Sequence, residues 1–145
     1  MPTRENVNKN ETVQILDPAV LTADTVTTGV DTADCNAAKI SVLVGESGDT
    51  LSGSVKWDFI LESSEDNSTW AAVTDTNLVV GQTVDSSGIF ATIDAAAEDD
   101  VVLTVGYIGY ARYFRVNIDA TGTHTNGTPM GAVAEKGNLQ LAPAV

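Results

Sequence analysis

The stretch of this sequence with the most potential for chemistry is "ESSEDNST", residues 62–69, which brings together the carboxylates Glu62, Glu65 and Asp66. A glycosidase needs two carboxyl groups about 5 to 10 Å apart across a cleft, and burial must raise the pKa of one of them. Ser, Asp and Asn also favour reversing turns, because their side chains bond to nearby backbone groups. We therefore expect an exposed turn here, and we assign no catalytic residue.

Other catalytic and metal-binding patterns are weak. Cys35 is the only cysteine and has no Cys or His neighbour in the sequence, so a catalytic thiol would depend on the only histidine, His124. We expect His124 to be an exposed residue of a Thr-, Asn- and Gly-rich loop. Asp and Asn on loops leave a bound Ca²⁺ as an alternative, but no EF-hand spacing assigns its ligands. We therefore predict a protein that is not an enzyme, with no cofactor and no assigned metal ligand.

Charge narrows the range of partners. The chain has 145 residues, with 20 acidic and 7 basic side chains and a formal net charge of −13. Such a chain repels phosphate backbones and anionic membrane surfaces, so we expect neither nucleic acid nor membrane as a partner. The first residues lack the apolar core of a signal peptide, and no segment reaches the roughly 20 apolar residues of a membrane span. We expect a soluble protein made in the cytoplasm.

The elements that must position these residues are strands. Apolar residues alternate with polar ones in short runs that Gly, Asp, Asn and Ser interrupt. This pattern predicts an all-β fold: a single antiparallel β-sandwich with Ig-like, jelly-roll or Greek-key connections. We expect a flexible arm at residues 1–10, a sandwich domain at 11–145 and a single helical turn in 94–100. The expected strands are 11–16, 37–45, 54–63, 70–73, 76–80, 88–93, 101–110 and 113–118, with one more in 131–145.

Two of these strands show which side faces the core. In 54–63, alternate apolar side chains share one face with Trp57, while charged side chains share the other. Ile60 interrupts the polar side, so we expect that side to be partly covered. In 113–118, Phe114, Val116 and Ile118 face one way, with Arg115 and Asn117 opposite.

Two stretches resemble a known class of protein. They are "LESSEDNSTWAAV" (61–73) and "GYARYFRVNIDATGTHTNGTPMGAVAEKG" (109–137), with weaker likeness in "CNAAKISVLVG" (35–45). This arrangement of strands and turns is similar to small structural proteins encoded among the virion genes of tailed bacteriophages and prophages. The resemblance spans roughly residues 53–141 and consists of turns and strands, not of catalytic residues.

The resemblance implies a virion component that decorates or cements the outer surface of the capsid and stabilises the shell. Its partners would be the major capsid protein and other copies of itself, including a trimer around a local three-fold. We expect contacts through an arm at residues 1–16 and a loop at 120–131. The candidate partner-binding residues are Trp70, Arg112, Arg115 and His124, although pairing of both arginines with local acids is the simpler expectation.

Two alternatives stay open at this point. One is a carbohydrate-binding virion module that aids host adhesion, in which Trp70 and the tyrosines at 107, 110 and 113 stack on sugar rings. The other is a tail component or a head–tail joining component.

Overall fold

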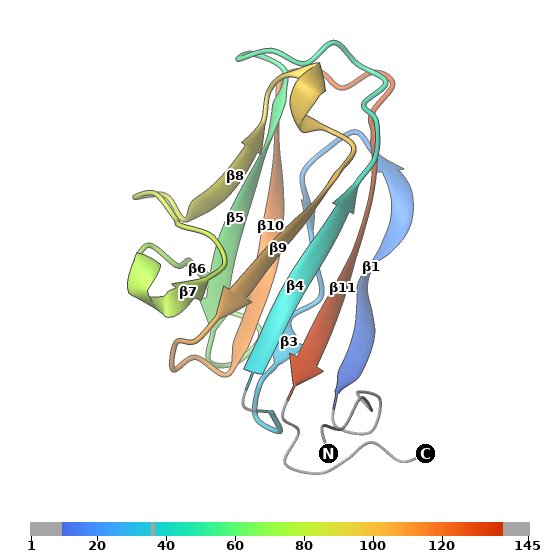
Figure 1. Cartoon of the computed structure of the whole chain (residues 1–145). Coiled ribbons are helices and arrows are strands. Elements are labelled where there is room, and N and C mark those ends of the chain that lie inside the picture. Colours follow the sequence, from blue (N-terminus) through green and yellow to red (C-terminus); the bar gives the residue numbers. More distant parts are fainter. Residues whose placement is uncertain (1–9, 36, 138–145) are drawn as a thin grey trace, which may run out of the picture.

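The computed structural model describes residues 10–35 and 37–137, which form two antiparallel sheets packed face to face (Figure 1). Sheet A contains, in spatial order, β1 (Glu11–Leu21), β11 (Thr128–Gly137), β4 (Ala37–Val44), β9 (Val101–Tyr107) and β7 (Val79–Val80). Sheet B contains β2 (Thr25–Val26), β3 (Val30–Asp31), β10 (Tyr113–Thr121), β5 (Lys56–Ser64), β6 (Ala71–Ala72) and β8 (Ile89–Ile93). The predicted all-β sandwich is confirmed.

Helical structure in this part of the chain is limited to two short 3₁₀ turns, η1 (Thr76–Leu78) and η2 (Ala96–Glu98). The second lies inside the segment where the sequence predicts a helical turn. Within residues 10–35 and 37–137, no helix has the length and apolar character needed to cross a membrane.

The chain alternates between the sheets, so partners within a sheet come from distant segments. Strands β9, β10 and β11 are consecutive, yet β10 belongs to sheet B and the other two to sheet A (Figure 1). As a result β11 pairs with β1 on one side and β4 on the other, while β10 pairs with β5.

The pairing of β5 with β10 organises the core. Nine residue pairs join the two strands, from Tyr113 opposite Ser64 to Thr121 opposite Lys56. Because strand side chains alternate, one face of this pair carries mostly apolar groups toward sheet A. Its fully buried members are Trp57, Phe59, Leu61, Phe114, Val116 and Ile118. The predicted inward faces of both strands are confirmed, and Ile60 is half-buried on the other side as expected.

Several predicted boundaries are wrong. β1 continues past residue 16 to Leu21, with irregular pairing on either side of Leu16. β9 ends at Tyr107, not at residue 110. The expected long loop at 120–131 is only residues 122–127, because both ends of that range belong to β10 and β11.

The expected contact arm at residues 1–16 is also corrected in part. Residues 11–16 are not free to order on a partner, because they pair with β11 from Glu11 opposite Lys136 onward. Residues 1–9 and 138–145 lie outside the described part of the chain, so the outer limits of the predicted arm and domain stay predictions.

A buried hydrogen bond links the two sheets near the start of β5 and of β11. Trp57 in β5 donates its Nε1–H to Oγ1 of Thr128 in β11 at 3.0 Å, and both side chains are fully buried. The Thr128 hydroxyl donates in turn to Oγ of Ser47 at 2.9 Å. The indole is thereby satisfied in an apolar environment, where an unpaired donor would be costly.

We expect Thr128→Val to lower the free energy of unfolding by about 1–3 kcal/mol, since the isosteric change leaves the Trp57 indole N–H without its partner. The measurement is urea unfolding followed by circular dichroism. The matched control is Thr12→Val in β1, where the side chain is exposed. Equal effects of the two substitutions would show that the buried hydrogen bond contributes nothing.

Candidate functional site

The acid-rich turn after β5 is held together by Asp66. Its Oδ1 accepts backbone N–H bonds from Ser68 (2.9 Å) and Thr69 (2.7 Å) and the hydroxyl of Ser64 (2.9 Å). These bonds favour the ionised form and lower the pKa of Asp66, with the Thr69 N–H as the largest cause. Asn67 adopts the left-handed conformation, with φ of 58°. The predicted turn is confirmed.

The three carboxylates of the turn do not converge. Glu65 and Asp66 are exposed at the tip. Glu62 lies back on the outer face of sheet B, where its Oε1 accepts from Nε of Arg115 at 2.8 Å. With two of the groups in solvent and the third in an ion pair, this stretch lacks the buried, protonated carboxyl that a glycosidase pair requires.

Trp70 and Arg115 form one packed unit. The Arg115 guanidinium lies 4.2 Å from the centre of the Trp70 ring, a cation–π geometry. Beyond it the ring approaches Gly29: a Cβ on that glycine would lie 2.9 Å from Cη2 of Trp70 and 2.2 Å from Oδ1 of Asn67. The tip of the β5–β6 hairpin therefore crosses the outer face of sheet B to the segment between β2 and β3.

Arg112 makes a bidentate ion pair with Asp31 in β3. Its Nε and Nη2 donate to the two carboxylate oxygens at 2.9 and 2.8 Å. The hydrogen bond to Arg112 is the main reason that the pKa of Asp31 falls from 3.8 to about 2. The same pair raises the pKa of Arg112.

All five lysines and arginines in the described part of the chain are paired with carboxylates. The expected local pairing of Arg112 and Arg115 is therefore what the structure shows. To bind a carboxylate of a partner, either guanidinium would first have to break its ion pair within the chain.

The expectation that His124 is an exposed loop residue is wrong. Its side chain is fully buried, with its ring centre 4.2 Å from that of Trp57. Nε2 lies 3.0 Å from the carbonyl oxygen of Thr121 and 3.2 Å from that of Lys56. Because carbonyls only accept, Nε2 carries a proton and donates. The side chain of His124, which the sequence analysis predicts to bind a partner, is buried in this conformation.

Asp49 fixes the rest of the same loop. Its carboxylate accepts from the backbone N–H groups of Asn126 (2.9 Å) and Gly127 (2.8 Å), and these bonds lower its pKa. Its Oδ2 lies 3.8 Å from Nδ1 of His124, which has no hydrogen-bond partner among the described residues. The loop 122–127 is thus tied to the core at both its histidine and its backbone.

The aromatic residues do not form a sugar-binding platform. Trp57 and Tyr107 are buried, Trp70 lies under Arg115, and Tyr113 has the Arg112 guanidinium 5.1 Å from its ring centre. Tyr110 is almost fully exposed but stands apart from these rings on a turn. Stacking on a sugar needs an open ring face, and three of the four rings predicted to stack are buried or covered by an arginine.

The described residues also show no reactive cysteine site and no metal-binding cluster. Cys35 is buried, and this burial raises the pKa of its thiol. Within residues 10–35 and 37–137, no three His, Cys, Asp or Glu side chains come together in a way that would hold a metal ion.

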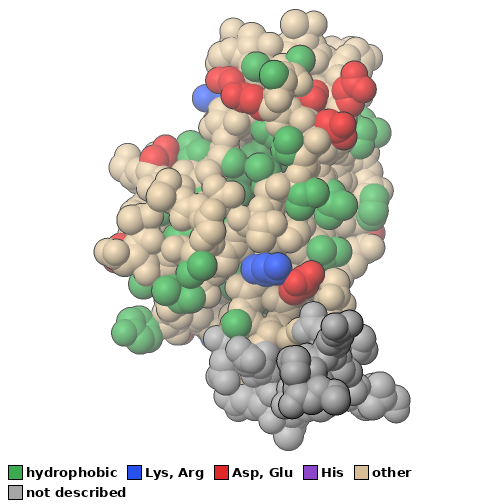
Figure 2. Space-filling model, viewed as in Figure 1, with side chains coloured by type: hydrophobic (Ala, Val, Ile, Leu, Met, Phe, Trp, Pro, Cys, Tyr) green, Lys and Arg blue, Asp and Glu red, His purple; other side chains and the backbone are tan. Residues whose placement is uncertain are grey.

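The feature that the sequence analysis missed is the outer face of sheet A. Its outward positions follow from the register, since paired residues of antiparallel strands point to the same side. Across the sheet, Leu43 lies between Val102 and Gly131, Ser41 between Thr104 and Val133, and Lys39 between Gly106 and Glu135. Figure 2 shows hydrophobic side chains spread over this face. The only charged side chains in these three rows are Lys39 and Glu135.

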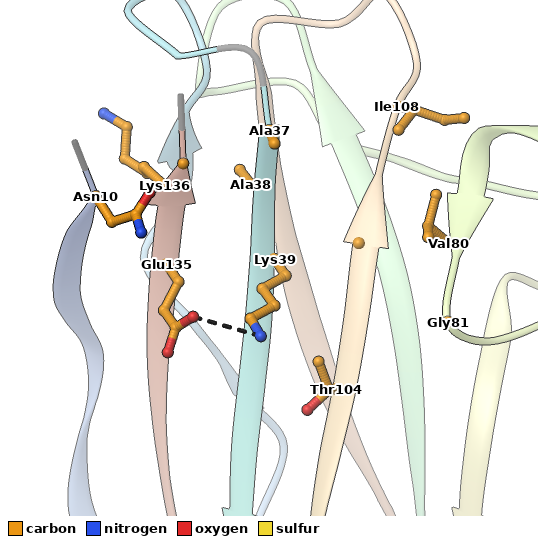
Figure 3. Close-up of a pocket in the computed structure, with 12 residues that line it drawn as sticks. Asn10, Ala37, Ala38, Lys39, Val80, Gly81, Thr104, Ile108, Glu135 and Lys136 are labelled. Atoms are coloured by element: carbon orange, nitrogen blue, oxygen red, sulfur yellow. Dashed lines mark ion pairs between the residues drawn. The ribbon is translucent and has the colours of Figure 1, made fainter. Parts of the chain in front are cut away.

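A groove of about 350 Å³ crosses one end of this face (Figure 3). The ion pair between Nζ of Lys39 and Oε2 of Glu135, at 3.4 Å, spans β4 and β11 within it. Val80 and Ile108 stand on the far side of β9, and both are more than half exposed. The glycine at position 106 keeps the floor low between them and Lys39. The groove surface is mostly apolar, with one ion pair across it.

Comparison with known proteins gives a fold likeness. No protein-family model matches the chain, and no curated protein matches it. Among solved structures, it is similar to PBSX exported protein XepA, with a TM-score of 0.52 and 15% sequence identity. The match covers 100% of this chain and 42% of that one, so the chain spans less than half the length of XepA. At this identity the likeness shows the sandwich fold alone.

We expect Gly29→Ala to displace the hairpin tip, because the added methyl group would collide with Asn67 and Trp70. Overpacking of this kind typically costs about 1–3 kcal/mol. The measurement is denaturant unfolding together with the emission maximum of Trp70 in a Trp57→Phe background. Gly53→Ala is the control, since nothing lies within 4 Å of its added Cβ. An unchanged Trp70 emission in Gly29→Ala would contradict the packing described.

We expect Asp31→Asn to flatten the dependence of stability on pH below pH 4. A carboxyl whose folded pKa is depressed to about 2 contributes stability above its ordinary pKa of 3.8 and loses it as the pH falls toward 2. Since the pair is half exposed, the contribution at neutral pH is no more than about 1 kcal/mol. Unfolding curves from pH 6 to 2 should show the gap between wild type and Asp31→Asn closing. Glu65→Gln, on the exposed turn, is the control; a gap that is constant with pH would refute the assignment.

Proposed function

We propose that this chain is a non-enzymatic structural protein of a bacteriophage virion, bound to the outer surface of the capsid as a decoration or cement protein. The observation that carries the proposal is that the two stretches with the sequence resemblance form one unit. The hairpin 61–73 and the strand of 109–137 meet along the β5–β10 pairing, where Arg115 covers Trp70. The residues that suggested chemistry thus serve to build a rigid module.

The fold likeness to XepA also supports the proposed role as a phage structural protein. The neighbour is named as an exported protein of PBSX, and the match covers 100% of this chain and 42% of that one. A protein that acts outside the cell that made it gains from a fold with few labile groups. Here the one buried thiol has a raised pKa, and the acidic turn is fixed by its own backbone.

The mechanism we propose is multivalent stabilisation of the shell. The major capsid protein presents the same site many times on a lattice, and each bound copy adds a small contact across neighbouring subunits. Repeated weak contacts then resist the pressure of the packaged DNA together, because engagement is coupled through the lattice. Contacts between copies of this chain, as in a trimer around a local three-fold, would add to the effect.

The two alternatives have less support. A carbohydrate-binding module needs exposed aromatic faces, and Trp70 has its face under Arg115. A tail or head–tail component would use the same rigid sandwich, and it differs from a decoration protein in copy number.

We expect purified particles to contain on the order of hundreds of copies of this chain, as repeated engagement of a shell lattice requires. Quantitative mass spectrometry against the major capsid protein measures this ratio. Particles that lack the chain should release DNA at a lower temperature, and adding the purified protein back should restore the release temperature. A dozen copies or fewer would instead favour a vertex or tail component, and absence from particles would refute a virion role.

A further inference from the structure

The two outer faces of the sandwich differ in charge. On sheet B, the outward side of β5 and β10 carries Lys56, Asp58, Glu62, Arg115 and Asp119, and the hairpin tip with Trp70 covers part of it. On sheet A, the three outward rows across β9, β4 and β11 hold a single ion pair and otherwise small or apolar side chains. Apart from this ion pair, the three rows carry no charge, on a chain whose net charge is −13.

Apolar side chains on this face are well exposed. Val102 is 61% and Leu43 is 48% exposed, and they lie opposite each other in the register. Beside them, Gly131 and the prolines at 18 and 129 border a second shallow hollow of about 270 Å³. Contiguous exposed apolar surface with shallow hollows is typical of protein-interaction sites. This face therefore suits contact with another folded protein.

One end of the face is strongly acidic. Glu46, Glu98 and Asp100 are exposed there, and Asp99 accepts the backbone N–H of Ser47 at 2.8 Å. Figure 2 shows acidic side chains gathered at this end, above the apolar part of the face. Because all lysines and arginines of the described residues already pair with acids, this part of the chain has no spare cation to neutralise them. A complementary partner must bring basic side chains to this end.

A second copy of the chain fits less well. It would bring no unpaired cation from its own described residues, and two chains of −13 repel each other at long range. Strand spacing and rise make the face roughly 20 Å by 25 Å. The area of such a face is below the ~800 Å² per partner of a standard stable interface. A soluble dimer through this face would be weak, whereas repeated copies on a lattice would not depend on one strong contact.

We propose that the outer face of sheet A is the docking face, and that its partner is a folded protein surface with an apolar centre and Lys or Arg side chains opposite the acidic end. This rests on the proposed function for the identity of the partner, which is then the capsid shell. Sheet A lies against the shell, and sheet B with its charged face and hairpin tip is turned away from it.

The test is binding of the purified chain to shells that lack it, measured by co-sedimentation over a range of protein concentrations. Val102→Asp and Leu43→Asp each place a charge in the apolar centre and should weaken binding at least tenfold, as truncation of a central interface residue does. The matched control is Val26→Asp, a 46% exposed valine in sheet B, which should bind within about twofold of wild type. Because all three positions are exposed, circular dichroism and thermal unfolding should show all three variants folded.

A double variant and its control test whether the acidic end of the face contributes to binding. The double variant Glu46→Gln, Glu98→Gln should bind more weakly at low salt and lose part of the salt dependence of wild type, since partners would be attracted by fewer charges. Glu65→Gln, an exposed acid on the hairpin tip, should leave both unchanged. Equal salt dependence in the double variant and this control would overturn the basic character of the partner.

The outcomes separate this inference from the proposed function. If wild type and all variants bind shells equally well, the virion role stands and the docking face is wrong. If wild type does not bind shells at all, the proposed function fails and the docking proposal falls with it. If sedimentation shows a dimer that Val102→Asp dissociates, a second copy covers the face. If a chain ending at Gly137 binds shells more tightly than the full chain, residues 138–145 cover it, and either result overturns the proposal.

Discussion

The register between β5 and β10 is the constraint on which the rest of the molecule depends. With Val116 opposite Leu61, every second residue of both strands points into the core. A slip of β5 by one residue would move Trp57 and Phe59 to the solvent side and bring Glu62 inside. The cost of burying that charge and exposing those rings fixes a single register. From it follow the ion pair of Glu62 with Arg115 and the position of Trp70 over that guanidinium.

Much of this pair could be predicted from the sequence, because apolar and polar residues alternate in both strands, with Ile60 as the exception, and the turn after β5 has its own chemistry. Asp66 acts on backbone groups only a few residues away, so local sequence is enough to predict the turn. His124 is different: its burial depends on Trp57, which is distant in sequence and reached only after β10 and β11 are placed. Its polar, glycine-containing neighbours suggested an exposed loop, and nothing local indicates the aromatic contact.

The outer face of sheet A also depends on contacts between residues that are distant in the sequence, so it could not be predicted from local patterns. Ser41 and Leu43 in β4, and Val102 and Thr104 in β9, are unremarkable outward residues when each strand is read alone. Only the pairing of Leu43 with Val102, and of Ser41 with Thr104, joins them into one surface. A signal was present in the lack of charge at these outward positions, but strand order was needed to show that it is contiguous. Local sequence is enough to predict a strand, whereas the surface that several strands form together depends on their order in the sheet.

The strands at the edges of the two sheets are poorly suited to pairing with another chain, which leaves the sheet faces for contact with a partner. Exposed strand edges invite pairing with other chains unless they are short, irregular or interrupted by proline. At one edge of sheet A, β7 has only two residues. At the other edge β1 is long, but its pairing is irregular on both sides of Leu16, and Pro18 within it has no N–H to donate. Among the edge elements of sheet B, β2, β3 and β6 have two residues each, while β8 has five. Because most edge elements are short or irregular and the net charge repels other copies, the largely apolar outer face of sheet A is the surface that we propose for association.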